Sequence, residues 1–238
     1  MLASTALAIA VAPSDITYSL FMTPIKIDFV SDIACPWCAV GLASLEQAIE
    51  RLGDEVSVSL HFQPFELNPD MPPEGEDILE HLMRKYQITA EQVAQNHEHI
   101  RERGAAVGFS FNLDGRKRTY NTFDAHRLLH WASASGDAEA QRRLKWRLLS
   151  AYFSEGADPS NHEVLLSAVE QVGLNVAQAT EILNTEMWHD EVRQQQQFYR
   201  SQGIHSVPAV IINDRYLVQG GQPPEAFEQA LRQIAAES

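Results

Sequence analysis

The sequence predicts an α/β protein with one β-sheet that a helical insertion interrupts. Near the start, residues 25–30 show a strand pattern, residues 42–52 a helical pattern and residues 56–62 a second strand pattern. Strand patterns return after Gly203, and the segments between are mostly helical. A strand, helix and strand of this length form a right-handed parallel crossover, so we expect both ends of the chain to share one sheet.

The first unit rests on two alternations and one helical face. Ile25, Ile27 and Phe29 alternate with polar residues, and this period of two residues predicts a strand. The next apolar residues repeat with helical spacing up to Gly53, which suits the residue just after a helix: Leu42, Leu45, Ala48, Ile49 and Leu52. Residues 56–62 alternate again and predict the second strand.

The middle of the chain is predicted to be helical. Residues 64–75 contain four prolines and form a loop. Thr89 and Gln92 have the spacing of a capping box, and Asn121 is the expected N-cap of a later helix. The expected helices cover residues 77–86, 89–103, 121–135, 137–154, 161–172 and 176–201, the last with a break near residue 184.

The C-terminal part returns to strands. Residues 209–212 and 216–218 are apolar and flank Asn213-Asp214, which predicts a hairpin. After Pro223-Pro224, one apolar face predicts a final helix that includes Phe227 and Leu231.

The composition makes several classes poor candidates. The chain has 238 residues, 45% of them hydrophobic, and a formal net charge of −14. Such a chain buries a sizeable core and is not expected to be disordered. An acidic chain without a basic stripe repels phosphate backbones, so we expect no nucleic-acid partner. No segment approaches the roughly 20 apolar residues that span a bilayer, so no membrane association is expected.

Residues 1–21 are interpreted as a leader. The apolar patch from Ala6 to Val11 is similar to the centre of a secretory signal, but no Lys or Arg precedes Lys26, and such signals begin with positive charge. We expect a disordered or mis-started leader, with Met22 as the alternative initiator. The expected location is the cytoplasm, with the periplasm as the alternative if the leader is a signal.

The two cysteines, Cys35 and Cys38, carry the chemical prediction. The sequence Cys-Pro-Trp-Cys lies where a strand turns into a helix, and a helix N-terminus stabilises a thiolate. Cys38 lies one turn further on the same face, so it can reach the Cys35 sulfur and resolve a mixed disulfide. Pro36 fits an early helical position. The alternatives are two inert buried thiols or half of a metal site, but two cysteines exclude a four-thiolate zinc site.

Three segments resemble the DsbA-like thioredoxin-fold oxidoreductases, particularly the FrnE subgroup. They are residues 28–41 around the Cys-Pro-Trp-Cys motif, Tyr120-Asn-Thr-Phe-Asp-Ala-His126, and Gly203-Ile-His-Ser-Val-Pro208. The resemblance extends from about Thr23 to the C-terminus and implies a thioredoxin fold with a large helical insertion. It implies a thioredoxin-like domain of residues 22–63 and 191–238, and an inserted domain of residues 64–190.

The resemblance also implies a site. It makes Cys35 and Cys38 the catalytic pair, and it implies a cis Val207–Pro208 bond beside them, with the Val207 backbone binding substrate. The helix that carries Asn121 and His126 is implied to face the cleft. Both residues also have structural interpretations, Asn121 as a cap and His126 as a partly buried polar residue.

Other residues near the motif are assigned by position. Trp37 is expected to be exposed, where its ring would help to hold a peptide or glutathione. No carboxylate stands six residues before Cys35, where many thioredoxin-fold enzymes keep a buried acid; Phe29 occupies that position. Proton transfer is therefore assigned to Asp32, His205 or water.

The leading hypothesis is a thiol-disulfide oxidoreductase that acts on protein, peptide or small thiols, with glutathione as a candidate redox partner. The alternative is a glutathione-dependent isomerase or transferase of the kappa-class or hydroxychromene-carboxylate isomerase type. Those relatives usually lack the second cysteine. A third hypothesis is a binding module for a peptide or metal. No cofactor or bound metal is expected, and a homodimer is left open.

Overall fold

The computed structural model describes residues 22–135, 137 and 139–237. The expected leader, residues 1–21, lies outside the described residues.

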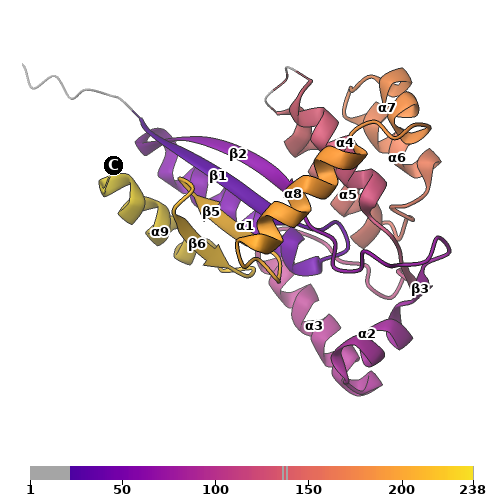
Figure 1. The fold of residues 1–238 in the computed structure, drawn as a ribbon. Coiled ribbons are helices and arrows are strands. Elements are labelled where there is room, and N and C mark those ends of the chain that lie inside the picture. Colours follow the sequence, from indigo (N-terminus) through magenta and orange to yellow (C-terminus); the bar gives the residue numbers. More distant parts are fainter. Residues whose placement is uncertain (1–21, 136, 138, 238) are drawn as a thin grey trace, which may run out of the picture.

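Four strands form the main sheet in the order β2-β1-β5-β6 (Figure 1). They are β1 (Thr23–Ser31), β2 (Val56–Pro64), β5 (Ala209–Ile212) and β6 (Tyr216–Gln219). β1 pairs parallel with β2 and antiparallel with β5, and β5 pairs antiparallel with β6. The two ends of the chain therefore build one sheet, as predicted.

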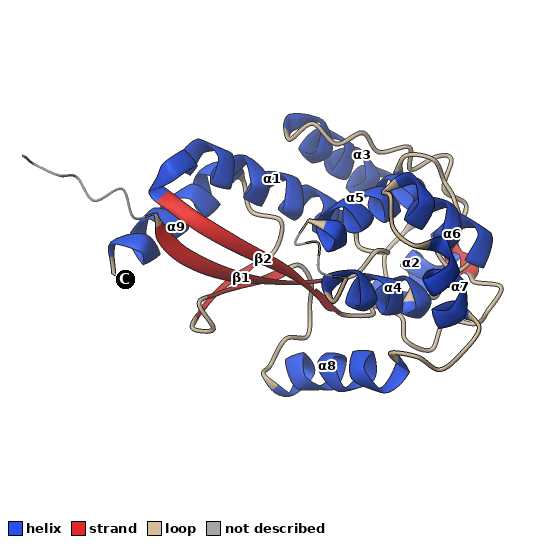
Figure 2. Cartoon of the chain, turned by 90° about the horizontal axis from the view of Figure 1, so that it is seen from above, coloured by secondary structure: helices blue, strands red, loops and turns tan. Residues whose placement is uncertain are grey.

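Helices cover both faces of this sheet. α1 (Pro36–Leu52) and α9 (Pro224–Ala236) lie on one side, and α8 (His189–Ser201) lies on the other (Figure 2). The double cover explains one difference from the predicted alternation. From Ile27 to Ser31 every residue of β1 is buried, including Asp28, because a central strand between two helical layers has no solvent face.

The hairpin between β5 and β6 is confirmed. Asn213 and Asp214 have positive φ angles of 51° and 55°. This pair of left-handed residues twists the chain in the same sense as the two strands, which is why Asn and Asp are favoured there.

Six helices lie between β2 and α8 in the described part of the chain. They are α2 (Ile78–Tyr86), α3 (Ala90–Ala106), α4 (Phe123–Ser133), α5 (Ala140–Phe153), α6 (His162–Gln171) and α7 (Val176–Leu183). The Thr89 and Gln92 capping box is confirmed at the start of α3. The break near Asn184 is also confirmed, since α7 ends at Leu183 and α8 begins at His189.

Two local predictions were wrong or incomplete. The N-cap of α4 is Thr122, not Asn121, although the Asn121 Oδ1 atom still accepts a 2.8 Å hydrogen bond from the Phe123 N–H. A second sheet of β3 (Glu76–Asp77) and β4 (Arg118–Thr119) was not predicted, because two-residue strands are too short to show a period.

The predicted domain boundaries stay predictions. The second of them, between residues 190 and 191, falls within the first turn of α8. In the described residues no helix combines the length and apolar character needed to cross a bilayer.

Candidate active site

The candidate site begins at the N-terminus of α1. Cys35 is the N-cap, with extended backbone angles, and Pro36 is the first helical residue. Proline is favoured there because the N–H group that it lacks would have no partner within the helix. The Cys38 N–H donates a 3.0 Å hydrogen bond to the Cys35 carbonyl. Cys35 therefore lies at the positive end of the α1 dipole.

The two cysteines are free thiols with different environments. The exposed fraction is 4% for Cys35 and 0% for Cys38, and Cys35 lines a cavity of about 880 Å³. Burial raises the pKa of Cys38 well above its usual value, and the adjacent Cys35 raises it further. Cys38 therefore stays protonated at neutral pH, whereas Cys35 borders the space that a ligand can enter.

The segment around Pro208 lies directly beside this pair. The Val207–Pro208 peptide bond is cis, and the Cys35 Sγ–H donates a 3.5 Å hydrogen bond to the Val207 carbonyl. A Cβ atom at Gly41 would lie 3.0 Å from the Pro208 Cγ atom and 3.3 Å from the Gly221 Cα atom. The absence of a side chain at Gly41 thus lets α1 approach this segment closely.

Asp32 is buried just before Cys35 and is fully engaged. Its Oδ1 accepts hydrogen bonds from the Ala34 N–H over 3.1 Å and the Thr122 hydroxyl over 2.7 Å, and its Oδ2 accepts one from the Leu67 N–H over 2.7 Å. Burial alone would raise the pKa of Asp32, but the nearby His126 and these donors lower it. A carboxylate held ionised in this way is a poor proton acceptor at neutral pH.

Lys145 is a buried cation that our sequence analysis missed. This α5 residue is 1% exposed, and the groups whose ionised forms raise its pKa are Cys38, Asp32 and Cys35. Burial lowers the pKa of Lys145 by more than these three groups raise it. Its position three and four residues before the buried Leu148 and Leu149 was the available signal, because that spacing places a lysine on the apolar face.

Neither Asn121 nor His126 lines the cavity. The His126 Nε2 atom is 3.5 Å from Asp32 Oδ1 and has no hydrogen-bond partner among the described residues. The Asn121 amide donates a 3.4 Å hydrogen bond to Glu66. These placements make both residues supports of the buried acids.

Trp37, Val207 and His205 line the cavity together with Cys35 and Pro36. His205 is exposed, whereas Trp37 is half-buried, so its predicted exposure was wrong. The Trp37 ring packs against His99, with ring centroids 5.5 Å apart. Contact with α3 covers one side of the indole, and α3 belongs to a segment whose packing the sequence did not specify.

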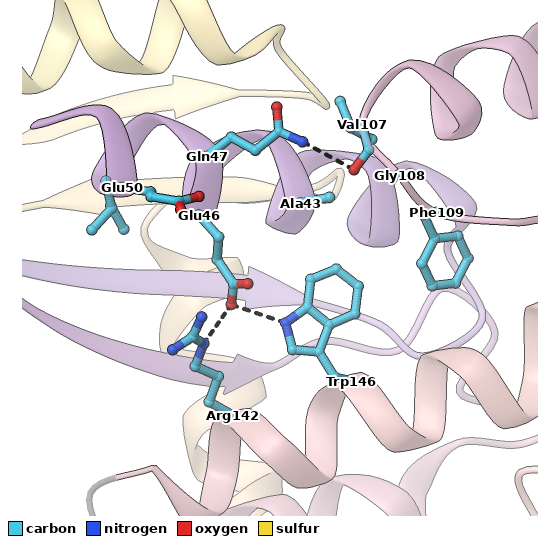
Figure 3. Close-up of a pocket in the computed structure, with 10 residues that line it drawn as sticks. Ala43, Glu46, Gln47, Glu50, Val107, Gly108, Phe109, Arg142 and Trp146 are labelled. Atoms are coloured by element: carbon cyan, nitrogen blue, oxygen red, sulfur yellow. Dashed lines mark hydrogen bonds and ion pairs between the residues drawn. The ribbon is translucent and has the colours of Figure 1, made fainter.

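A second hollow of about 680 Å³ lies between α1 and α5, away from both cysteines. Figure 3 shows Glu46 at its centre, facing Arg142 and Trp146. The Glu46 carboxylate accepts a 2.6 Å hydrogen bond from Arg142 and a 2.9 Å bond from the Trp146 indole. Because the polar groups at its centre are already paired, the cavity at Cys35 is the better candidate site.

No group of three or more His, Cys, Asp or Glu side chains within the described ranges is placed to hold a metal ion.

Comparison with known proteins gives consistent results. The family model described as the DSBA-like thioredoxin domain matches residues 26–232. The structure of a probable DsbA oxidoreductase, SCO1869 from Streptomyces coelicolor, is 30% identical, has a TM-score of 0.83, and covers 90% of this chain and 91% of its own. The uncharacterized protein YwbO of Bacillus subtilis (strain 168) is 27% identical over 209 residues, which are 87% of this chain and 96% of YwbO.

A more distant structure shares the fold. It is the cytosolic disulfide reductase DsbM from Pseudomonas aeruginosa with GSH. It is 18% identical, has a TM-score of 0.60, and covers 88% of this chain and 98% of its own.

Proposed function

Since the chain belongs to the DSBA-like thioredoxin domain family, we propose that it is a thiol-disulfide oxidoreductase whose redox centre is Cys35 and Cys38. One observation carries the proposal. Cys35 caps a helix at the wall of a cavity, while Cys38 lies fully buried one turn behind it. A thiol at the cavity wall and a thiol with no exposed surface are suited in this arrangement to attack and resolution respectively.

In the first step the Cys35 thiolate attacks one sulfur of a substrate disulfide. An S–S bond forms between Cys35 and that sulfur, the substrate S–S bond breaks, and the other half leaves as a thiolate that takes a proton from water. The backbone of Val207 borders Cys35 and offers hydrogen-bonding groups to an extended substrate, as the family resemblance implies. The product is a mixed disulfide with Cys35.

In the second step the buried Cys38 resolves the mixed disulfide. The Cys38 S–H transfers its proton to the Lys145 amine, whose pKa is lowered by burial, and the Cys38 sulfur attacks Cys35 Sγ. The second half of the substrate leaves as a thiolate and takes a proton from water, while Lys145 keeps the proton from Cys38. The substrate gains two electrons, the enzyme ends with a Cys35–Cys38 disulfide, and the reverse sequence oxidises a dithiol.

The proposed partners are protein or peptide thiols and glutathione. The cavity beside Cys35 has room for a small molecule, and the similar DsbM structure is one with GSH. No further cofactor is needed for exchange between thiols and disulfides. FrnE subgroup membership rests on the three sequence motifs. A cytoplasmic location stays a prediction, because residues 1–21 lie outside the described residues.

The two cysteine variants test the proposal as a matched pair. Wild type, Cys35→Ser and Cys38→Ser are incubated with glutathione disulfide or insulin, and both exchange rate and intact protein mass are measured. We expect Cys35→Ser to lose exchange with both substrates. We expect Cys38→Ser to accumulate a mixed disulfide whose added mass disappears on reduction. Equal rates for Cys35→Ser and wild type would refute the function.

The glutathione-dependent isomerase remains the alternative. An isomerase has no need of a resolving thiol, so Cys38→Ala would keep its turnover of a small aromatic substrate in the presence of glutathione. The presence of a second free thiol, Cys38, one turn behind Cys35 favours the oxidoreductase.

A further inference from the structure

The cavity beside Cys35 contains a buried arginine without a hydrogen-bond acceptor. Arg116 precedes β4, is 5% exposed, and lines the same cavity as Cys35. Within the described residues its Nε–H has no hydrogen-bond partner and no carboxylate forms an ion pair with it. A guanidinium is always charged and has five N–H donors, so leaving it unpaired in a buried position costs free energy.

The other lysine and arginine side chains on the cavity wall have acceptors. Lys85 Nζ donates to the Leu67 carbonyl over 2.8 Å and to the Asn68 side chain over 2.6 Å. Arg200 donates a 3.2 Å hydrogen bond to the Glu66 carbonyl. Arg116 differs from both, because the described residues provide no oxygen acceptor for its guanidinium.

Two aromatic rings explain how Arg116 is held. Its guanidinium carbon lies 5.1 Å from the ring centroids of both Tyr152 and Phe153. Cation–π contacts stabilise the charge, but they provide no oxygen acceptor for the N–H groups. The rings thus hold a guanidinium for which the described residues provide no oxygen acceptor.

His97 adds a second unpaired group on the same wall. Its Nε2 atom is buried and has no hydrogen-bond partner among the described residues. Burial lowers the pKa of His97, and the charge of Arg116 lowers it further. An anion bound at Arg116 would reduce this repulsion.

The charge of the cavity wall is opposite to that of the whole chain. One lysine and two arginines line it, whereas the net charge of the sequence is −14. One carboxylate, Glu66, belongs to the described wall, and it is already paired with Arg193. A positive concave surface on an acidic protein attracts anions selectively.

We propose that Arg116 is the binding site for a carboxylate of the substrate, and that the substrate is a low-molecular-weight thiol or disulfide carrying that carboxylate. This inference rests on the proposed function, because the substrate's sulfur must reach Cys35 from the same cavity. The volume of about 880 Å³ suits a small molecule. An arginine fork recognises a carboxylate through two parallel hydrogen bonds.

The test uses two aromatic disulfides that differ in charge. 5,5′-Dithiobis(2-nitrobenzoate) carries carboxylates, and 4,4′-dithiodipyridine carries none. We expect Arg116→Gln to slow the reaction of the reduced protein with the first reagent by at least about tenfold more than with the second. Arg116→Lys should restore part of the rate. Lys117→Gln removes the same charge from an exposed neighbour and should affect neither reagent.

Two results would overturn the inference. One is an equal effect of Arg116→Gln on both reagents. The other appears in a second comparison, between glutathione disulfide and a disulfide peptide with a free or amidated C-terminus. If the reaction rate depended on Arg116 for the peptide with a free C-terminus but not for glutathione disulfide, Arg116 would be a binding site for peptides and not for a small thiol. We expect dependence with glutathione disulfide.

Failure of the proposed function gives a different result. In that case wild type and Cys35→Ser would exchange with glutathione disulfide at equal rates, whatever residue stands at position 116. Thermal unfolding checks the fold of Arg116→Gln. We expect its melting temperature to equal or exceed that of wild type, because the substitution removes an unpaired buried charge.

Discussion

The Cys35 sulfur and the Val207 carbonyl are 3.5 Å apart and share a hydrogen bond. This contact joins the first turn of α1 to the segment that precedes β5, although the two residues are 172 positions apart in the sequence. The geometry at Cys35 therefore depends on how closely α1 packs against the segment around Pro208.

Gly41→Ala is predicted to disturb that packing. The new methyl group would lie 3.0 Å from Pro208 Cγ and 3.3 Å from Gly221 Cα, so α1 and the Pro208 segment must separate. Alanine would favour the helix by about 0.5–1 kcal/mol, but we expect overpacking to win and to cost about 1–3 kcal/mol of unfolding free energy. Chemical denaturation and the rate of mixed-disulfide formation measure the two effects. If the variant were more stable than wild type and kept its rate, the segment around Pro208 would move away from the new methyl group at no cost, and the prediction would be wrong.

The sequence predicted the sheet well because its signals are local. The strand predicted over Ile25 to Phe29 and the hairpin at Asn213-Asp214 depend on neighbouring residues alone, and both form in the structure, although Asp28 is buried where the alternation predicts an exposed side chain. The cap of α4 was misplaced by one residue, because Asn121 and Thr122 are both good N-cap residues and tertiary contacts selected between them. Thr122 donates its hydroxyl to Asp32, a partner 90 positions earlier.

The candidate site was predictable only in part for the same reason. Cys35 and Cys38 form a local motif at a recognisable junction, and the sequence identifies them. Lys145 left a weak signal as a lysine on an apolar helical face. Arg116 left none, because the burial of a loop residue depends on Tyr152 and Phe153, which lie in a distant helix.

Asp32→Asn is predicted to destabilise the protein by about 3 kcal/mol, since hydrogen bonds to a charged acceptor are each worth about 1.5–3 kcal/mol. The stabilising effect of Asp32 should depend on pH in a direction that its pKa determines. The pKa of Asp32 is lowered from 3.8 in the folded protein, so its stabilising effect is complete above that value and is lost as the pH falls through the folded-state pKa. The difference between wild type and variant, measured by urea unfolding, should shrink on acidification. A difference independent of pH would contradict the assignment.

Lys145→Met is predicted to stabilise the protein at neutral pH. The folded-state pKa of Lys145 is lowered from 10.5, so between that lowered value and 10.5 the unfolded chain binds more protons and the stability of wild type rises with pH. Methionine removes this dependence. The advantage of the variant in unfolding free energy should therefore be largest at low pH and shrink towards pH 10.5. A variant that is less stable at every pH would show that Lys145 is held mainly as a cation.

The same Lys145→Met variant should separate the two chemical steps. Attack by Cys35 on 4,4′-dithiodipyridine does not need Lys145, so the first rate should stay within about twofold of wild type. Resolution should slow by about 100-fold, a typical contribution of a positioned proton acceptor. Because the charge of Lys145 lowers the pKa of Cys38, its removal should also move the pH profile of resolution to higher pH.

Stopped-flow absorbance resolves the first step, and quenched samples analysed by intact mass follow the mixed disulfide. Lys117→Met serves as the exposed control and should resolve at the wild-type rate. A purely structural role for Lys145 would change both steps together and leave the pH profile in place.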